Sequence, residues 1–173
     1  MSDRTVDSNG DHDFIRNEAS IQIGAVAGDE QLQILKELFR EYAATLGIDL
    51  AFQGFDREVN GLPGAYVPPR GRLLLARVDG GVAGCVAVRP LSADTCEMKR
   101  LYVKPEFRGK GVGALLIDRI IAEARSCGFR RMVLDTLPEM HTATALYAAA
   151  GFRRCEAYYQ TPIRDTVFME LSL

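Results

Sequence analysis

The chain has 173 residues, of which 47% are hydrophobic and 25% are charged, and its formal net charge is −2. This balance is typical of a soluble globular protein of one domain, and it excludes a mostly disordered chain. No stretch approaches the roughly 18 apolar residues of a membrane-spanning helix, and the polar N-terminus is unlike a secretory signal. The four cysteines form no C-x-x-C pair, so we expect reduced thiols, a cytoplasmic location, no membrane partner and no metal.

Residues 1–19 are rich in acids and poor in apolar side chains, so we predict a flexible tail ahead of one domain over residues 20–173. The first half is predicted to contain a strand at 20–27, a helix capped by Asp29 and ended by Gly47, a short helix near 56–60, and a hairpin of strands at 72–78 and 82–89. The second half is predicted to contain a strand at 95–103, a helix at 111–127, a strand at 131–135, a helix that Pro138 opens and Gly151 ends, and strands at 152–157 and 166–171. This order indicates an α/β (α+β) fold.

The charge is unevenly distributed along the chain. Residues 99–131 contain nine Lys or Arg and three Asp or Glu, a local charge of +6 inside an otherwise acidic protein. Such a segment favours a local anion site over a nucleic-acid surface. A solvated helix face explains the same cations about as well, so the neighbouring residues must decide.

Those neighbours form a glycine-rich turn, R-G-K-G-V-G at residues 108–113, between a predicted strand and a predicted helix. Its glycines allow a tight turn and a close approach of the backbone to a ligand, and a helix start supplies free N–H donors. The turn is therefore predicted to bind a pyrophosphate through Arg108, Gly109, Lys110, Gly111, Val112 and Gly113.

Three kinds of phosphate loop were compared with this turn. A Walker A loop needs Lys-Ser or Lys-Thr, which is absent after Gly113. A dinucleotide fingerprint fits poorly, because only one β-α-β unit is present. The pattern R-x-x-G-x-G at Arg108, Gly111 and Gly113 fits best.

Together with the preceding L-Y-V-x-P and the later L-Y-x-x-x-G-F of residues 146–152, this turn resembles the GCN5-related N-acetyltransferase (GNAT) superfamily, most closely its small bacterial acetyltransferases. The resemblance covers most of residues 20–171. It implies a mixed, mostly antiparallel sheet of about seven strands, with helices on both faces and splayed parallel fourth and fifth strands. It also implies acetyl-CoA (coenzyme A) as co-substrate, with the pantetheine along the backbone of Leu101 and Val103. Many relatives carry an asparagine just after the fifth strand that contacts the cofactor. This chain reads Asp135-Thr136-Leu137-Pro138 there, so the resemblance assigns no cofactor contact to that turn.

The implied reaction is acetyl transfer to a primary amine of a small molecule or peptide, by direct attack in a ternary complex. By resemblance Tyr147 is the predicted general acid and Glu97 the predicted base, while the backbone N–H of Val103 polarises the thioester carbonyl. The structural alternatives are an aromatic that fills a groove and a carboxylate paired with Lys99. His141 is a weaker candidate base, and no cysteine is expected to act as nucleophile.

The acceptor site is poorly specified. Four residues lie where relatives build it, Phe52, Gln53, Phe55 and Tyr66, and the net charge of −3 over residues 20–70 mildly favours a cationic amine. A non-catalytic acyl-CoA binder or sensor remains the first alternative function, because a fold alone does not prove catalysis. An NAD-dependent oxidoreductase is the second, and a homodimer is left open.

Overall fold

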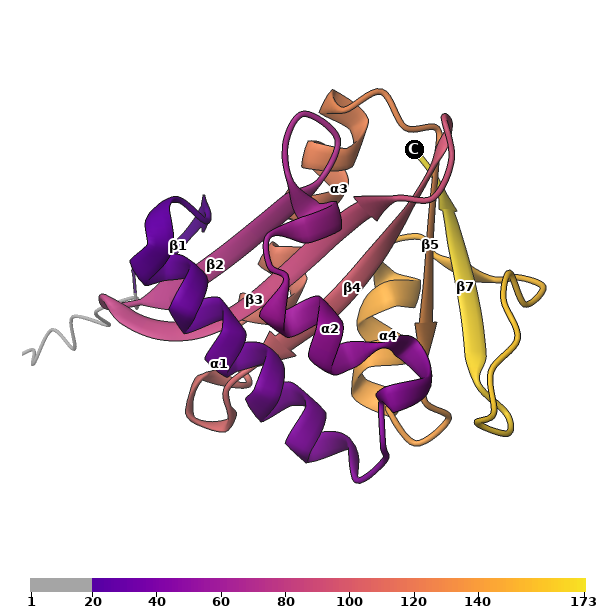
Figure 1. Cartoon of the computed structure of the whole chain (residues 1–173), viewed down its shortest axis with the longest axis horizontal. Helices are drawn as coiled ribbons and strands as arrows, with labels where there is room; N and C mark the ends of the chain where they lie inside the picture. Colours follow the sequence, from indigo (N-terminus) through magenta and orange to yellow (C-terminus); the bar gives the residue numbers. More distant parts are fainter. Residues whose placement is uncertain (1–19) are drawn as a thin grey trace, which may run out of the picture.

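The computed structural model describes residues 20–173, and the predicted tail at residues 1–19 lies outside them. The first half of this range forms the strands β1 (Ile21–Ala25), β2 (Arg72–Val78), β3 (Gly81–Pro90) and β4 (Thr95–Val103), with the helices α1 (Gly28–Leu46) and α2 (Phe55–Asn60). The second half forms α3 (Val112–Ser126), β5 (Arg131–Thr136), α4 (His141–Ala149), β6 (Arg153–Arg154) and β7 (Val167–Ser172). Short 3-10 turns lie at Ala51–Gln53, Gly64–Tyr66 and Pro105–Phe107 (Figure 1).

The strands form one seven-stranded sheet in the order β1-β2-β3-β4-β5-β7-β6. All neighbouring strands are antiparallel except β4 and β5, which are parallel. The predicted mixed, mostly antiparallel fold is therefore confirmed.

Strands β4 and β5 pair only at their beginnings, from Thr95 opposite Arg131 to Glu97 opposite Val133, and then separate (Figure 1). The cause lies on the other side of β4, where the register against β3 shifts between Lys99 and Tyr102. Arg100 has a φ of 59° at this irregularity, which is the local bend of a β-bulge. The predicted splay is thus a consequence of a bulge in β4.

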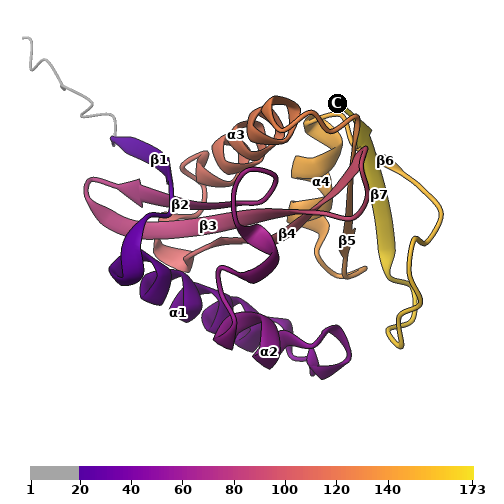
Figure 2. The same cartoon turned by 45° about the horizontal axis from the view of Figure 1, so that its top comes forward.

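The helices cover both faces of the sheet (Figure 2). On one face α1 and α2 pack Leu35, Leu38, Phe39 and Val59 against the sheet. On the other face α3 packs an apolar stripe that includes Leu116, Ile117 and Ile120, and α4 adds Tyr147. Two apolar cores therefore hold the sheet from both sides, and the gap between β4 and β5 lies between them.

Three local predictions were wrong. Helix α4 begins at His141 and not at Pro138, because residues 137–140 form a turn in which the N–H of Met140 donates to Leu137 O at 3.0 Å. Asp29 does not cap α1: the cap residue is Ala27, whose N–H donates to the side chain of Gln31. The strand predicted at 152–157 shrinks to Arg153–Arg154, and residues 156–166 leave the sheet as a long loop.

Within residues 20–173, no helix combines the length and the apolar character that crossing a membrane requires.

Candidate active site

A large cleft of about 960 Å³ opens where β4 and β5 separate. Its walls come from the C-terminal half of α1, the end of β4, the turn before α3, and the turn that leads into α4. These segments are distant in sequence, and the splay of the two strands brings them around one opening. The cleft is the largest concave feature around which the predicted residues gather.

The predicted phosphate turn lines one end of this cleft. Gly109 and Gly111 have φ values of 73° and 81°, a left-handed conformation that side chains disfavour. None of the backbone N–H groups from Gly109 to Ala114 donates to a backbone acceptor within the described part of the chain, and the first helical bond runs from Leu115 to Gly111 O at 3.1 Å. Six amides at a helix start, next to a cleft, form the donor array that a pyrophosphate needs.

The two predicted cations of the turn differ in position. Arg108 is exposed, lines the cleft, and donates from Nε to Val103 O at 3.0 Å. That bond leaves its other guanidinium nitrogens free to face an anion. Lys110 is not part of the lining, and its ammonium lies 5.3 Å from the centre of the Phe107 ring. Arg108 is therefore the better placed of the two for a direct contact.

Leu101 and Val103 both line the cleft on β4, beyond the last residue that pairs with β5. This edge of β4 therefore has no strand partner on the cleft side, as main-chain pairing with a pantetheine would require. Gly113 allows the helix to approach: a Cβ there would lie 3.2 Å from Leu146 and 3.8 Å from Val103.

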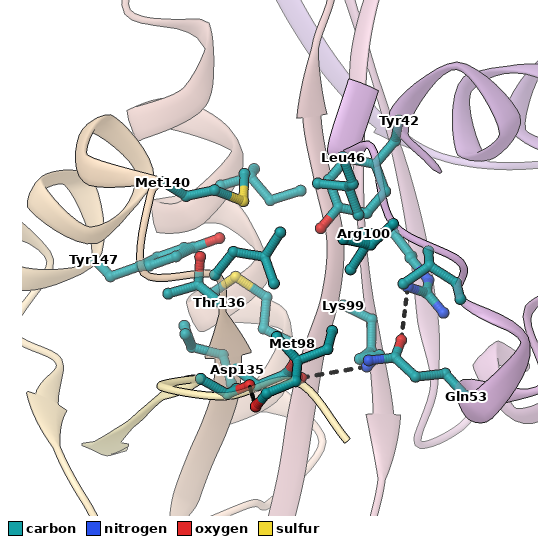
Figure 3. Close-up of a pocket in the computed structure, with 17 residues that line it drawn as sticks. Tyr42, Leu46, Gln53, Met98, Lys99, Arg100, Asp135, Thr136, Met140 and Tyr147 are labelled. Atoms are coloured by element: carbon teal, nitrogen blue, oxygen red, sulfur yellow. Dashed lines mark hydrogen bonds and ion pairs between the residues drawn. The ribbon is translucent and has the colours of Figure 1, made fainter. Parts of the chain in front are cut away.

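A smaller cavity of about 40 Å³ lies in the gap between the strands and shares Tyr42, Leu101 and Met140 with the lining of the cleft. Figure 3 shows the residues that line it. Met98 and Leu101 line it from β4, Leu134 and Thr136 from β5, and Tyr147 from α4. Tyr147 is buried, with its ring packed edge-on against Phe152, and its hydroxyl points into the cavity (Figure 3). Burial, with smaller contributions from Tyr42 and Asp135, holds the pKa of Tyr147 far above its usual range. At neutral pH its hydroxyl is a proton donor.

Glu97 lies outside the cavities, whereas a base that contacts the amine would have to line one of them. It is only 2% exposed, lines neither cavity, and accepts bonds from Arg89 Nε at 2.8 Å and from the Tyr158 hydroxyl at 2.8 Å. Its other near neighbour is the ammonium of Lys99, at 3.6 Å. Arg89 and Glu97 are directly opposite each other on β3 and β4. The structure therefore places Glu97 in a buried ion cluster next to the site.

Asp135 is the carboxylate that does line the small cavity. Its Oδ1 lies 3.4 Å from the ammonium of Lys99, which also lines this cavity. Along β5, Asp135 alternates with its neighbours Leu134 and Thr136, so it projects to the opposite face of the sheet from them. The two faces of the gap thus differ. The hydroxyls of Thr136 and Tyr147 lie on the α4 side, and the pair of Lys99 and Asp135 lies on the α1 side.

Of the four predicted acceptor-site residues, only Gln53 lines the small cavity. Its side-chain oxygen accepts from Arg100 Nη1 at 3.0 Å, and Arg100 also binds Glu58 at 2.6 Å. Phe55 is buried beneath Arg100, and Tyr66 is buried with its hydroxyl donating to Glu58 at 2.7 Å. Phe52 is 38% exposed. These three line neither cavity.

Comparison with known proteins gives the family. The family model described as Acetyltransferase (GNAT) family matches residues 32–152. The chain belongs to the GNAT family. An uncharacterised N-acetyltransferase of Schizosaccharomyces pombe is 43% identical over 157 residues, which cover 90% of this chain and 96% of that protein. The protein is accordingly an acyl-CoA-dependent N-acetyltransferase, as the turn and its flanking motifs predicted.

Solved GNAT structures share the fold. An acetyltransferase of Streptococcus agalactiae is similar with a TM-score of 0.70 at 24% identity, over 88% of this chain and 98% of that chain. An acetyltransferase of Salmonella typhimurium, solved with its cofactor acetyl-CoA, has a TM-score of 0.64 at 22% identity, over 90% and 94% of the two chains. At this identity the likeness supports the fold alone.

Tyr42, Asp135 and Thr136 are among the lining residues of the small cavity that sequence reasoning missed. Tyr42 reaches it from α1, and burial, partly opposed by the charge of Arg100, raises its pKa to about 12. The alternation of residues along β5 was the one available signal for the other two. His141 is exposed at the rim of the large cleft. Residues 20–173 hold no cluster of three or more His, Cys, Asp or Glu side chains arranged for a metal ion.

Proposed function

We propose that this protein transfers the acetyl group of acetyl-CoA directly to a primary amine of a small molecule or peptide. The observation that carries the proposal is that the two cavities share part of their lining. The turn at residues 108–113 lines the large cleft, Tyr147 lines the small cavity, and Leu101, Leu137 and Met140 line both. A long donor molecule with a diphosphate at one end and a reactive group at the other fits this distribution of chemistry.

In this proposal the six residues of the turn bind the diphosphate. Leu101 and Val103 offer main-chain groups to the pantetheine, and the N–H of Val103 polarises the thioester carbonyl. Tyr147 gives its proton to the sulfur as the C–S bond breaks. Its hydroxyl points into the small cavity (Figure 3) and is protonated at pH 7, which supports this role.

The attacking amine must first lose a proton. A lysine-like amine with a pKa of about 10.4 needs roughly 4.6 kcal/mol for this at pH 7. Asp135 faces the cavity and has only a loose contact with Lys99, so we propose it as the group that receives the proton, directly or through water. Glu97 lines neither cavity, so as the predicted base it would have to act through its neighbour Lys99.

The acceptor enters from the side of α1 and of the loop before β7, where Gln53, Lys99 and Asp135 meet. Both signs of charge occur there, which suits an acceptor that carries polar groups of its own. All four cysteines are free thiols, and this supports a cytoplasmic location as part of the proposal. A homodimer stays a prediction that gel filtration at several concentrations would test.

The experiment is release of coenzyme A thiol from acetyl-CoA on addition of amino acids, polyamines and lysine-containing peptides. At least one amine is expected to accelerate release and to yield its acetylated product by mass spectrometry. Binding of acetyl-CoA with no turnover on any amine would instead favour the non-catalytic sensor. Tight NADH binding would revive the oxidoreductase.

A further inference from the structure

Thr136, the last residue of β5, carries a buried polar atom that nothing in the fold explains. Its side chain is 5% exposed, and its hydroxyl oxygen is the one buried side-chain N or O atom without a hydrogen-bond partner among the described residues. A buried hydroxyl without a partner destabilises the folded state, and valine has the same shape without that penalty. An unpartnered group of this kind in a cavity indicates that something else binds it during function.

The location of Thr136 indicates what that partner is. It lines the small cavity together with Tyr147, and in Figure 3 its hydroxyl lies on the same side of the gap as the hydroxyl of Tyr147 and points toward it. The rest of the wall around them is largely apolar, with Met98, Leu134 and Met140. A cavity of about 40 Å³ is about three times the roughly 10–15 Å³ that one water molecule needs, so it has room for only a few water molecules. It therefore admits only the thin end of a ligand.

We propose that Thr136 is a second catalytic hydroxyl, which donates a hydrogen bond to the sulfur of the acyl donor as the thiolate forms. The inference rests on the proposed function and deepens it. As the amine nitrogen bonds to the carbonyl carbon, the C–S bond breaks and its electron pair stays on sulfur. The proton of Tyr147 moves to that sulfur, while Thr136 keeps its own proton and only shares it.

Tyr147 and Thr136 have different roles because their surroundings differ. The pKa of Tyr147 is raised by burial, so its proton leaves with difficulty and negative charge first gathers on sulfur. A second donor that shares this charge lowers the energy of the step at which the C–S bond breaks, and hydrogen bonds to charged atoms are the strong ones. Within residues 20–173 the hydroxyl of Thr136 has no competing partner, so it can supply that bond.

The test compares Thr136→Val, which removes the hydroxyl and keeps the branched shape, with Thr136→Ser, which keeps the hydroxyl. With acetyl-CoA and the best amine of the panel, we expect Thr136→Val to lower kcat by about 10-fold or more with the KM for acetyl-CoA within about threefold. Thr136→Ser should keep kcat within about threefold of the parent. Thr136→Val should also melt no lower than the parent, and about 2–4 °C higher if removing the unpartnered hydroxyl gains 1 kcal/mol.

A kcat within twofold of the parent for Thr136→Val overturns the inference. So does an equal loss in Thr136→Ser, because then the hydroxyl is not the cause. If the parent turns over no amine, the proposed function fails. The role of Thr136 toward sulfur is then tested by ligand binding alone. In that case Thr136→Val should weaken binding of coenzyme A about two- to tenfold and leave binding of desulfo-coenzyme A unchanged. An equal change for both ligands would overturn the inference.

Discussion

The ammonium of Lys99 on β4 lies 3.4 Å from a carboxylate oxygen of Asp135 on β5, across the gap where the two strands no longer pair. Charge-assisted N–H···O bonds are usually 2.7–2.9 Å long, so this contact is loose. Lys99 is also 3.6 Å from Glu97 and is therefore shared between two carboxylates. Asp135 is thus a carboxylate that lines the cavity without a close ion pair.

For Asp135→Asn we expect kcat/KM at pH 7 to fall by about 100-fold, because the amide accepts no proton from the amine. The deficit should shrink as the pH approaches the pKa of the acceptor, since more of the amine is then already neutral. A pH profile of kcat/KM for parent and variant measures this. A variant with the parental profile would remove Asp135 from the proton path.

Glu97→Gln tests whether Glu97, and not Asp135, is the base. Glu97 is 2% exposed and satisfies Arg89 and the hydroxyl of Tyr158, so the variant should lose about 1–3 kcal/mol of unfolding free energy. Its kcat, measured well below the melting temperature, should stay within about fivefold of the parent. Urea unfolding and steady-state kinetics on the same sample separate the two effects. Full stability with a large loss of kcat would make Glu97 the base.

Tyr147→Phe should lower kcat by about 100-fold or more, because the ring stays packed on Phe152 while the proton donor is lost. Affinity for coenzyme A should change little, as the diphosphate turn is untouched. Calorimetric binding together with single-turnover kinetics would measure both. Unchanged turnover would exclude the tyrosine as the acid.

Arg108→Ala should weaken coenzyme A binding by about 1.5–3 kcal/mol, which is the range for hydrogen bonds to charged groups. The difference from the parent should be smaller at high salt, because Arg108 is exposed and its charge is screened. Arg154→Ala is the matched control, since Arg154 is exposed on β6 and lines neither cavity. Equal losses in the two variants would argue against a site at the turn.

Glu58 gives a prediction about acid stability. Burial alone would raise its pKa, but hydrogen bonds and charge from Arg100 outweigh burial and hold the pKa below its usual range. A lowered carboxyl pKa stabilises the fold above the unfolded pKa of about 4.3, and this contribution is lost as the pH falls through the folded value. Glu58→Gln should therefore cost about 1–3 kcal/mol at pH 7, with the difference from the parent shrinking below about pH 4. A difference that is constant from pH 7 to pH 3 in urea unfolding would contradict this.

The features that the sequence predicted well are those with a local signal. Gly109 and Gly111 mark the turn because their backbone conformation excludes most side chains, and the stripe that contains Leu116 and Ile120 marks α3 because it repeats at helical spacing. The parallel, splayed strands were predicted from the family resemblance, because no residue in the sequence of β4 indicates the bulge at Arg100.

The arrangements around the site that the sequence did not predict depend on contacts between different segments. Glu97 is tied to Arg89 by the register of β3 against β4, and the pairing of Lys99 with Asp135 needs β5 to lie beside β4. Pattern alone does not give either arrangement. Likewise the sequence does not show that the hydroxyl of Thr136 lacks a hydrogen-bond partner among residues 20–173.

A crystal structure with bound coenzyme A tests the central claim most directly. The account predicts the diphosphate on the turn at residues 108–113, the pantetheine along Leu101 and Val103, and the sulfur between Tyr147 and Thr136. A cofactor bound elsewhere, with that turn empty and the small cavity facing no sulfur, would contradict it.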